Sequence, residues 1–141
     1  MSSKTWIVVA DGFLGRLFRL VEGQEGLIEV ETLANPEGRL HDTEIISDAY
    51  GRSGGGDTYE DRRNEHDVVR DTFARDIIHN LEKHRTRGEL EKLYLVAEPR
   101  FLGLLRSHMK KELSQCLEAE VAHDLVKHSN EEIRKALPSM T

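Results

Sequence analysis

A run of three glycines, Gly54, Gly55 and Gly56, is the part of the sequence best suited to close contact with another molecule. Glycine has no side chain, so the backbone amides of such a run can approach a phosphate group or another backbone. The run does not follow a predicted strand, and its spacing matches neither a Walker loop nor a dinucleotide-binding fingerprint. A loop tip without a binding role is an equally good interpretation of these glycines.

Basic side chains near the glycines and in the segment from Glu98 to Lys111 form a second set of candidate contacts. That segment holds four bases and one acid, whereas residues 22–48 hold eight acids and one base. Arginine is suited to bidentate contact with phosphate, so the uneven distribution predicts a locally basic surface for a polyanion. Ordinary solvated charges, paired with neighbouring acids, are the alternative. The candidate polyanion-binding residues are Arg52, Arg62, Arg63, Arg100, Arg106 and Lys110.

Two carboxylates, Asp11 and Asp124, follow the first and the last predicted strands. Together with Glu65 or Asp71 they would form a Mg²⁺ site for phosphodiester cleavage, provided that the two strand ends meet. Turn and cap chemistry, which aspartate favours, is the alternative interpretation. The seven histidines lack metal-ligand spacing, and the sequence contains no nucleophile elbow. We therefore expect no bound metal, no cofactor and no catalytic residues, which describes a non-enzymatic protein.

Length and composition favour one globular domain spanning residues 1–141, with 38% hydrophobic and 33% charged residues. The net charge of −6 argues against a protein that coats DNA non-specifically. The single cysteine, Cys116, excludes an intrachain disulfide. The longest apolar runs, 6–10 and 93–97, are too short to span a membrane, and the first is too short for a signal-peptide core. We therefore expect a cytoplasmic protein without membrane insertion.

The elements that must position these residues begin with three predicted strands. Residues 6–10 form a continuous apolar run that is typical of a strand buried on both faces. Residues 17–21 and 27–33 flank a glycine-containing turn and indicate an antiparallel hairpin. Residues 34–63 have little apolar periodicity and predict a long glycine-rich loop, of the length that is usually functional or disordered.

The pattern changes to a helical period at Asn64 and then alternates between strands and helices. We expect helices centred near 66–86, 99–113 and 130–137, the last beginning with a capping box at 129–132. Strands are expected at 93–97 and 117–121. Because the later strands alternate with helices, part of the sheet should be parallel. The predicted fold is a single layered α/β domain with a mixed β-sheet.

Three stretches resemble the bacterial family of host attachment proteins. They are Trp6 to Gly12 with Arg16-Leu17-Phe18, the segment 93–106 with the sequence LYLVAEPRFLGLLR, and His123 to Lys127. The similarity covers nearly the whole chain, and 93–106 is its most specific part. The resemblance implies a factor required for attachment to host cells, with the host-attachment machinery as its partners.

The same family resembles, more distantly, the central domain of archaeal and eukaryotic peptide release factors. That resemblance implies an RNase H-like, release-factor-like fold, with the ribosome as a partner. Gly54-Gly55-Gly56 lies near the position of the Gly-Gly-Gln loop in those factors, but Asp57 follows and no glutamine is present. Peptidyl-tRNA hydrolysis is therefore not expected.

These observations predict a non-enzymatic binding protein that contacts RNA or the ribosome through the glycine-rich loop and the basic helix. Two alternatives stay open. One is an attachment factor that acts through protein partners, and the other is a metal-dependent nuclease on an RNase H-like sheet.

Overall fold

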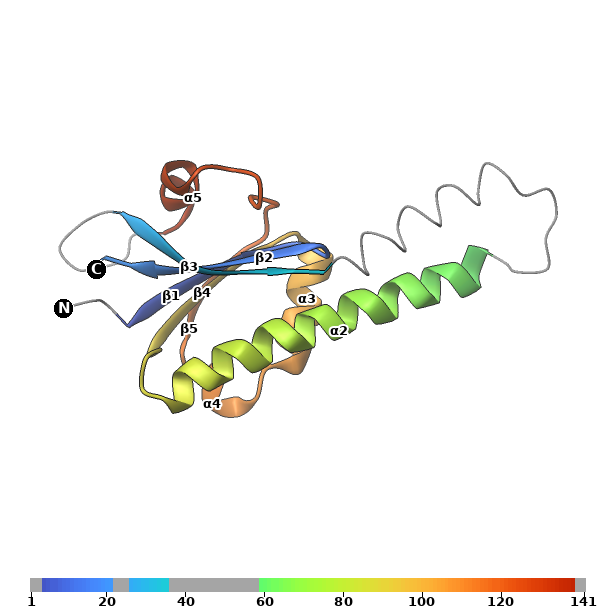
Figure 1. The fold of residues 1–141 in the computed structure, drawn as a ribbon, viewed down its shortest axis with the longest axis horizontal. Helices are drawn as coiled ribbons and strands as arrows, with labels where there is room; N and C mark the ends of the chain where they lie inside the picture. Colours follow the sequence, from blue (N-terminus) through green and yellow to red (C-terminus); the bar gives the residue numbers. More distant parts are fainter. Residues whose placement is uncertain (1–3, 22–25, 36–58, 139–141) are drawn as a thin grey trace.

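The computed structural model describes residues 4–21, 26–35 and 59–138, with side chains from residue 67 onward in the last range. The strands are β1 (Thr5–Ala10), β2 (Leu14–Leu20), β3 (Leu27–Ala34), β4 (Lys92–Ala97) and β5 (Leu117–Val121). The helices are α2 (Tyr59–Thr86), α3 (Pro99–His108), α4 (Lys111–Ser114) and α5 (Asn130–Ala136) (Figure 1). The predicted order of strands and helices is confirmed, except that two helices, α3 and α4, occupy the predicted helix at 99–113.

The five strands form one sheet in the order β3-β2-β1-β4-β5. β1 pairs antiparallel with β2 and parallel with β4, while β3 and β5 occupy the two edges. The predicted antiparallel hairpin of β2 and β3 is present. The strands β1, β4 and β5 pair in parallel and are connected through helices, because parallel neighbours need a long connection. The α/β class with a mixed sheet is therefore confirmed.

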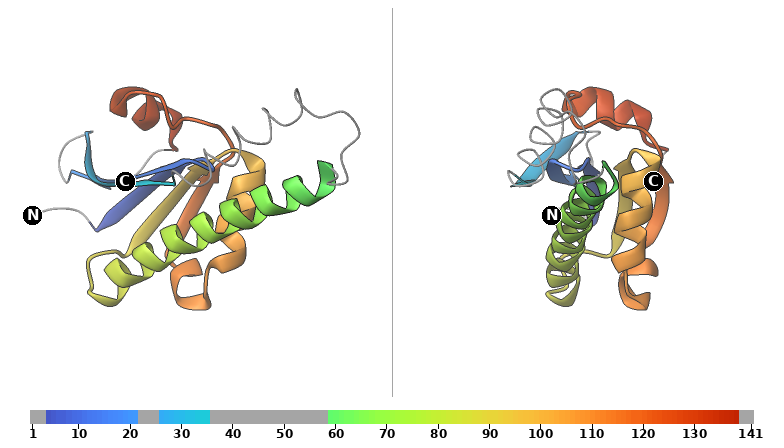
Figure 2. Two further views of the ribbon diagram at one scale, coloured as in Figure 1. Left: turned by 45° about the vertical axis from the view of Figure 1, so that its right-hand side comes forward. Right: turned by 90° about the vertical axis from the view of Figure 1, so that its right-hand side faces the viewer.

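Two layers cover the two faces of the sheet. Trp6 and Val8 of β1 pack into a core with α2, α3 and α4, whereas Ile7 and Val9 pack against the C-terminal segment with α5. Figure 2 shows α2 and α3 side by side on one face and α5 on the other. Alternate side chains of a strand point to opposite faces, so a strand covered on both sides has the continuous apolar sequence seen at 6–10.

Helix α2 begins earlier than the sequence pattern indicates. We expected a loop through residue 63, but Tyr59 to Arg63 already belong to the helix. These residues carry mostly polar side chains without an apolar stripe, and the helical period becomes visible in the sequence only further along. At the other end of the predicted loop, Ala34 already belongs to β3. Residues 36–58, including Arg52 and Gly54 to Gly56, lie outside the described residues.

The predicted helix 99–113 is wrong as a single element, because the chain turns at Met109 and Lys110. Both residues have extended backbone angles, and α4 starts afresh at Lys111. No proline or glycine marks this break. Two tertiary contacts accompany it, the pairing of His108 with Asp71 of α2 and the complete burial of Leu113 in the core beneath the helices.

Candidate functional site

The predicted basic residues of the segment 98–111 lie on the outer surface of the helical layer. Phe101, Leu102 and Leu105 of α3 are buried, and Arg100 and Arg106 lie among the positions of the helix that are not buried. The side chains of Arg100 and Arg106 are 52% and 56% exposed, and Lys110 is exposed at the start of α4. A surface of basic side chains is therefore present at this segment.

Each of the two arginines also holds a carboxylate that the sequence pattern did not indicate. Arg100 Nη2 donates to Asp67 Oδ1 of α2 at 2.7 Å, and Arg106 Nε donates to Glu120 Oε2 of β5 at 2.9 Å. The two arginines point to different neighbours, so they do not form one cluster. Ion pairs with this exposure contribute about 0.2–1 kcal/mol each, so a phosphate can compete for either arginine.

A groove of about 300 Å³ lies between α2 and the junction of α3 and α4. We call it the helix groove. It is lined by Arg75, Ile78, His79, Glu82, His108 and Lys110. Of these residues only Lys110 was among the candidates from the sequence. The spacing of Arg75 and His79, one helical turn apart, is visible in the sequence, but their proximity to His108 and Lys110 depends on how the helices pack.

A second groove, of about 450 Å³, lies where the end of β3 meets α2. Its lining mixes backbone and side chains of β3 with both acidic and basic residues of α2. These residues are Thr32, Leu33, Ala34, Asn35, Phe73, Asp76, His79, Asn80 and Lys83. The opposed charges of Asp76 and Lys83 make this groove less suited to an anion than the helix groove.

Of the four carboxylates considered for a Mg²⁺ site, Asp11 and Asp71 have other partners, and the side chain of Glu65 lies outside the described residues. Asp11 Oδ1 accepts hydrogen bonds from the backbone N–H groups of Phe13 and Leu14, both at 2.8 Å, and so caps the turn after β1. Asp71 pairs with His108, and Asp124 is exposed. Within the described ranges, no three histidine, cysteine, aspartate or glutamate side chains are placed to hold a metal ion. Asp11 therefore has the turn role that was the alternative interpretation.

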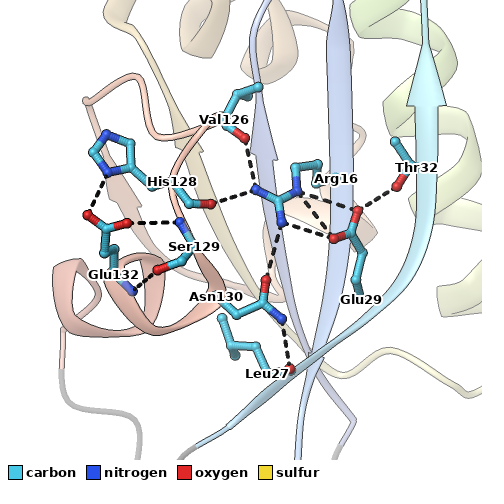
Figure 3. A network of polar contacts seen from close by, with 9 residues as sticks. All are labelled: Arg16, Leu27, Glu29, Thr32, Val126, His128, Ser129, Asn130 and Glu132. Carbon is cyan, nitrogen blue, oxygen red and sulfur yellow. Dashed lines mark hydrogen bonds and ion pairs between the residues drawn. The ribbon is translucent and has the colours of Figure 1, made fainter.

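The C-terminal segment is held on the sheet by Arg16 of β2, which the sequence analysis did not single out (Figure 3). Arg16 Nη1 donates to the backbone carbonyls of Val126 and His128 at 2.8 and 2.9 Å. Its Nη2 donates to Asn130 Oδ1 at 3.2 Å and to Glu29 Oε1 at 3.0 Å. The sequence gives little signal for this role, because β2 carries two arginines, Arg16 and Arg19, among apolar residues and a glycine.

The Arg16 guanidinium lowers the pKa of Glu29 below its usual value of 4.5, chiefly through the hydrogen bond to its carboxylate. A carboxyl whose pKa is lower in the folded protein stabilises the fold at pH values above its usual pKa. That stabilisation is lost as the pH falls through the lowered value.

Glu29→Gln should therefore weaken the dependence of unfolding free energy on pH between about pH 5 and about pH 2. Urea unfolding at a series of pH values measures this dependence. Some of it should remain, because backbone and side-chain hydrogen bonds from Ser129 also lower the pKa of Glu132. Glu91→Gln is the matched control, since the Glu91 carboxylate forms an exposed pair with Lys4. An acid dependence identical to wild type in Glu29→Gln would contradict the prediction.

None of the helices in the described ranges contains a stretch that is both long and apolar enough to cross a membrane.

Comparison with known proteins finds a relative and a family. An uncharacterised protein of Rickettsia prowazekii (strain Madrid E) is 30% identical to this chain over 84 residues. The match covers 58% of this chain and 56% of the relative, so it spans little more than half of either protein. A family model described as "Protein required for attachment to host cells" matches residues 6–137, from the buried Trp6 to Leu137 after α5. This chain belongs to the family of proteins required for attachment to host cells.

Proposed function

We propose that this member of the attachment family is a non-enzymatic protein that binds RNA, either free or within the ribosome, through its basic helical surface. The observation that carries the proposal is the outward placement of Arg100, Arg106 and Lys110 on a protein with a net charge of −6. A local basic surface on an acidic protein directs a polyanion to one place, because the rest of the molecule repels it.

The glycine-rich loop is the second part of this proposal. Gly54, Gly55 and Gly56 precede α2 by only a few residues, and Arg62 and Arg63 lie in its first turns. The resemblance to release-factor central domains implies a ribosomal contact for this loop, and that resemblance stays a prediction. The missing glutamine is the reason for proposing binding without peptidyl-tRNA hydrolysis.

Charge reversal at two basic positions tests the proposal. The double variant Arg106→Glu, Lys110→Glu should bind RNA or ribosomes at least about tenfold more weakly. The slope of log affinity against log salt concentration should also become shallower, by the equivalent of about two phosphate contacts. Binding is measured at about 50 and about 200 mM salt, because each phosphate contact releases counterions.

The double variant Lys4→Glu, Lys135→Glu is the matched control. It changes the net charge by the same amount at two exposed lysines whose pairs, with Glu91 and Glu131, are also exposed. Equal losses of affinity in both double variants would show that net charge alone causes the effect. Unchanged affinity and salt slope in Arg106→Glu, Lys110→Glu would remove the basic helix from the mechanism.

The description of the family favours a second function, attachment to host cells through protein partners. On this chain the apolar side chains of Ile28 and Val30 in the edge strand β3 are exposed and offer a surface for a protein. Sedimentation of the protein with ribosomes from a cell lysate distinguishes the two functions. Cosedimentation supports RNA or ribosome binding, and its absence favours the protein partner. Mg²⁺-dependent cleavage of RNA that is lost in Asp11→Asn would support the nuclease alternative instead.

A further inference from the structure

We infer that the helix groove, formed by Arg75, Ile78, His79, Glu82, His108 and Lys110, binds one unpaired nucleotide. This inference rests on the proposed function, because it names the part of an RNA that enters the basic helical surface. The positively charged side chains of Arg75 and Lys110 contact the phosphate. The rings of the two histidines contact the base.

The charge of the groove favours an anion. Arg75 and Lys110 are positively charged, and Glu82 is the only carboxylate in the lining. Arg85, from outside the lining, holds that carboxylate through a hydrogen bond from its Nε to Glu82 Oε1 at 2.9 Å. Among the described side chains, Arg75 has a loose pair with Asp76 at 3.8 Å, in which both side chains are more than half exposed. The two cations are therefore available to a phosphate, with little opposing charge inside the groove.

The two histidine rings and the apolar side chain of Ile78 in the groove favour a nucleotide over inorganic phosphate. Ile78 is buried and provides an apolar surface, and His79 and His108 contribute imidazole rings from two different helices. His108 is held in place, since its Nε2 lies 2.9 Å from Asp71 Oδ1. Unpaired bases stack on histidine rings and on arginine guanidinium planes, whereas the bases of a duplex are already stacked and cannot enter.

The dimensions agree with this assignment. A volume of about 300 Å³ lies at the lower end of the range for small-molecule pockets, which suits one nucleotide. The groove also borders the surface that carries Arg106, because Lys110 belongs to both. A single-stranded RNA bound along α3 therefore passes the groove and can place one base in it.

The first experiment compares three probes on the full chain. Adenosine 5′-monophosphate should shift the NMR signals of the Ile78 methyl groups and of the His79 and His108 rings. Inorganic phosphate should leave the Ile78 methyl groups unchanged. A single-stranded RNA should bind about tenfold more tightly than a duplex of equal charge, as the stacking of one base would provide. Identical shifts with phosphate and with the nucleotide would reduce the groove to an anion site and overturn the inference.

Two variants of exposed residues on α2 complete the test. His79→Ala should remove the preference for single-stranded RNA, and Arg75→Glu should weaken nucleotide binding at least about tenfold. Lys83→Glu is the matched control for Arg75→Glu, because Lys83 lies on the same helix but lines the other groove. Equal losses of nucleotide affinity in these two charge reversals, or no loss in either, would contradict nucleotide binding in the groove.

The two proposals can fail separately. RNA binding that depends on Arg106 but shows no preference for single strands, and no effect of Arg75→Glu, would overturn the groove and leave the proposed function intact. Nucleotide binding in the groove without any binding of RNA or ribosomes would overturn the proposed function and leave the nucleotide site intact.

Discussion

Trp6→Ala should lower the free energy of unfolding by about 3–5 kcal/mol, the range expected when a buried tryptophan is truncated in a packed core. Trp6 is buried at the centre of the sheet, and its ring centroid lies 4.4 Å from that of His84 of α2. Its Nε1 donates to the backbone carbonyl of Glu89 at 2.9 Å. One residue thus joins β1, the end of α2 and the connection to β4, so its loss leaves a cavity and an unsatisfied carbonyl.

Urea unfolding followed by far-UV circular dichroism measures the effect, because Trp6 is the only tryptophan and its fluorescence is lost in the variant. Trp6→Phe separates packing from hydrogen bonding. It keeps an aromatic ring and should cost only about 1–3 kcal/mol, chiefly from the unpaired carbonyl of Glu89. A loss below about 1 kcal/mol in Trp6→Ala would show that the β1–α2 contact does not stabilise the fold.

Arg16→Ala should destabilise the protein by about 2–4 kcal/mol and loosen the C-terminal layer before the rest unfolds. The Arg16 side chain is only 15% exposed and donates to two backbone carbonyls of the segment 126–128. Its removal leaves those carbonyls without this donor, while the Glu29 carboxylate keeps its hydrogen bond from the Thr32 hydroxyl. Most of the cost should come from the carbonyls that lose a charged donor, because the Glu29 side chain is 30% exposed and water can solvate its carboxylate.

Hydrogen exchange locates the effect within the molecule. The amides of Ile133 and Leu137, which are bonded to the carbonyls of Ser129 and Arg134, should exchange faster in Arg16→Ala. The amides of β1 and β4 should keep their slow exchange. Arg75→Ala serves as the control, since Arg75 is exposed and should cost less than about 0.5 kcal/mol. Uniformly faster exchange across the sheet would mean that Arg16 supports the whole fold and not one layer.

Local patterns in the sequence were sufficient to predict most of the elements. The apolar runs at 6–10 and 93–97 became the buried strands β1 and β4, and Pro99 starts α3. The capping box at the start of α5 is present as predicted, with Ser129 Oγ accepting from the backbone N–H of Glu132. These features depend on residues only a few positions apart, so the sequence contains all the information that decides them.

Two boundaries were not predictable from such patterns. The first turns of α2, from Tyr59, carry no apolar stripe, and the break at Met109 and Lys110 has no helix-breaking residue. Helix propensity is a weak preference that tertiary contacts override. At the break, the contact of His108 with Asp71 and the burial of Leu113 accompany a turn that the sequence would allow to continue as helix.

The candidate site also combines features that the sequence predicts with features that depend on tertiary packing. Charge counting along the sequence located the exposed bases Arg100, Arg106 and Lys110, because a local excess of one charge is a property of neighbouring residues. The carboxylates that hold the two arginines come from other elements, 33 and 14 positions away in the chain. The helix groove needs α2 to lie beside α3, and the bonds from Arg16 to the C-terminal segment connect residues at least 110 positions apart. Periodicity states which side of an element is buried but not which element covers it, so only the packed tertiary structure decides these contacts.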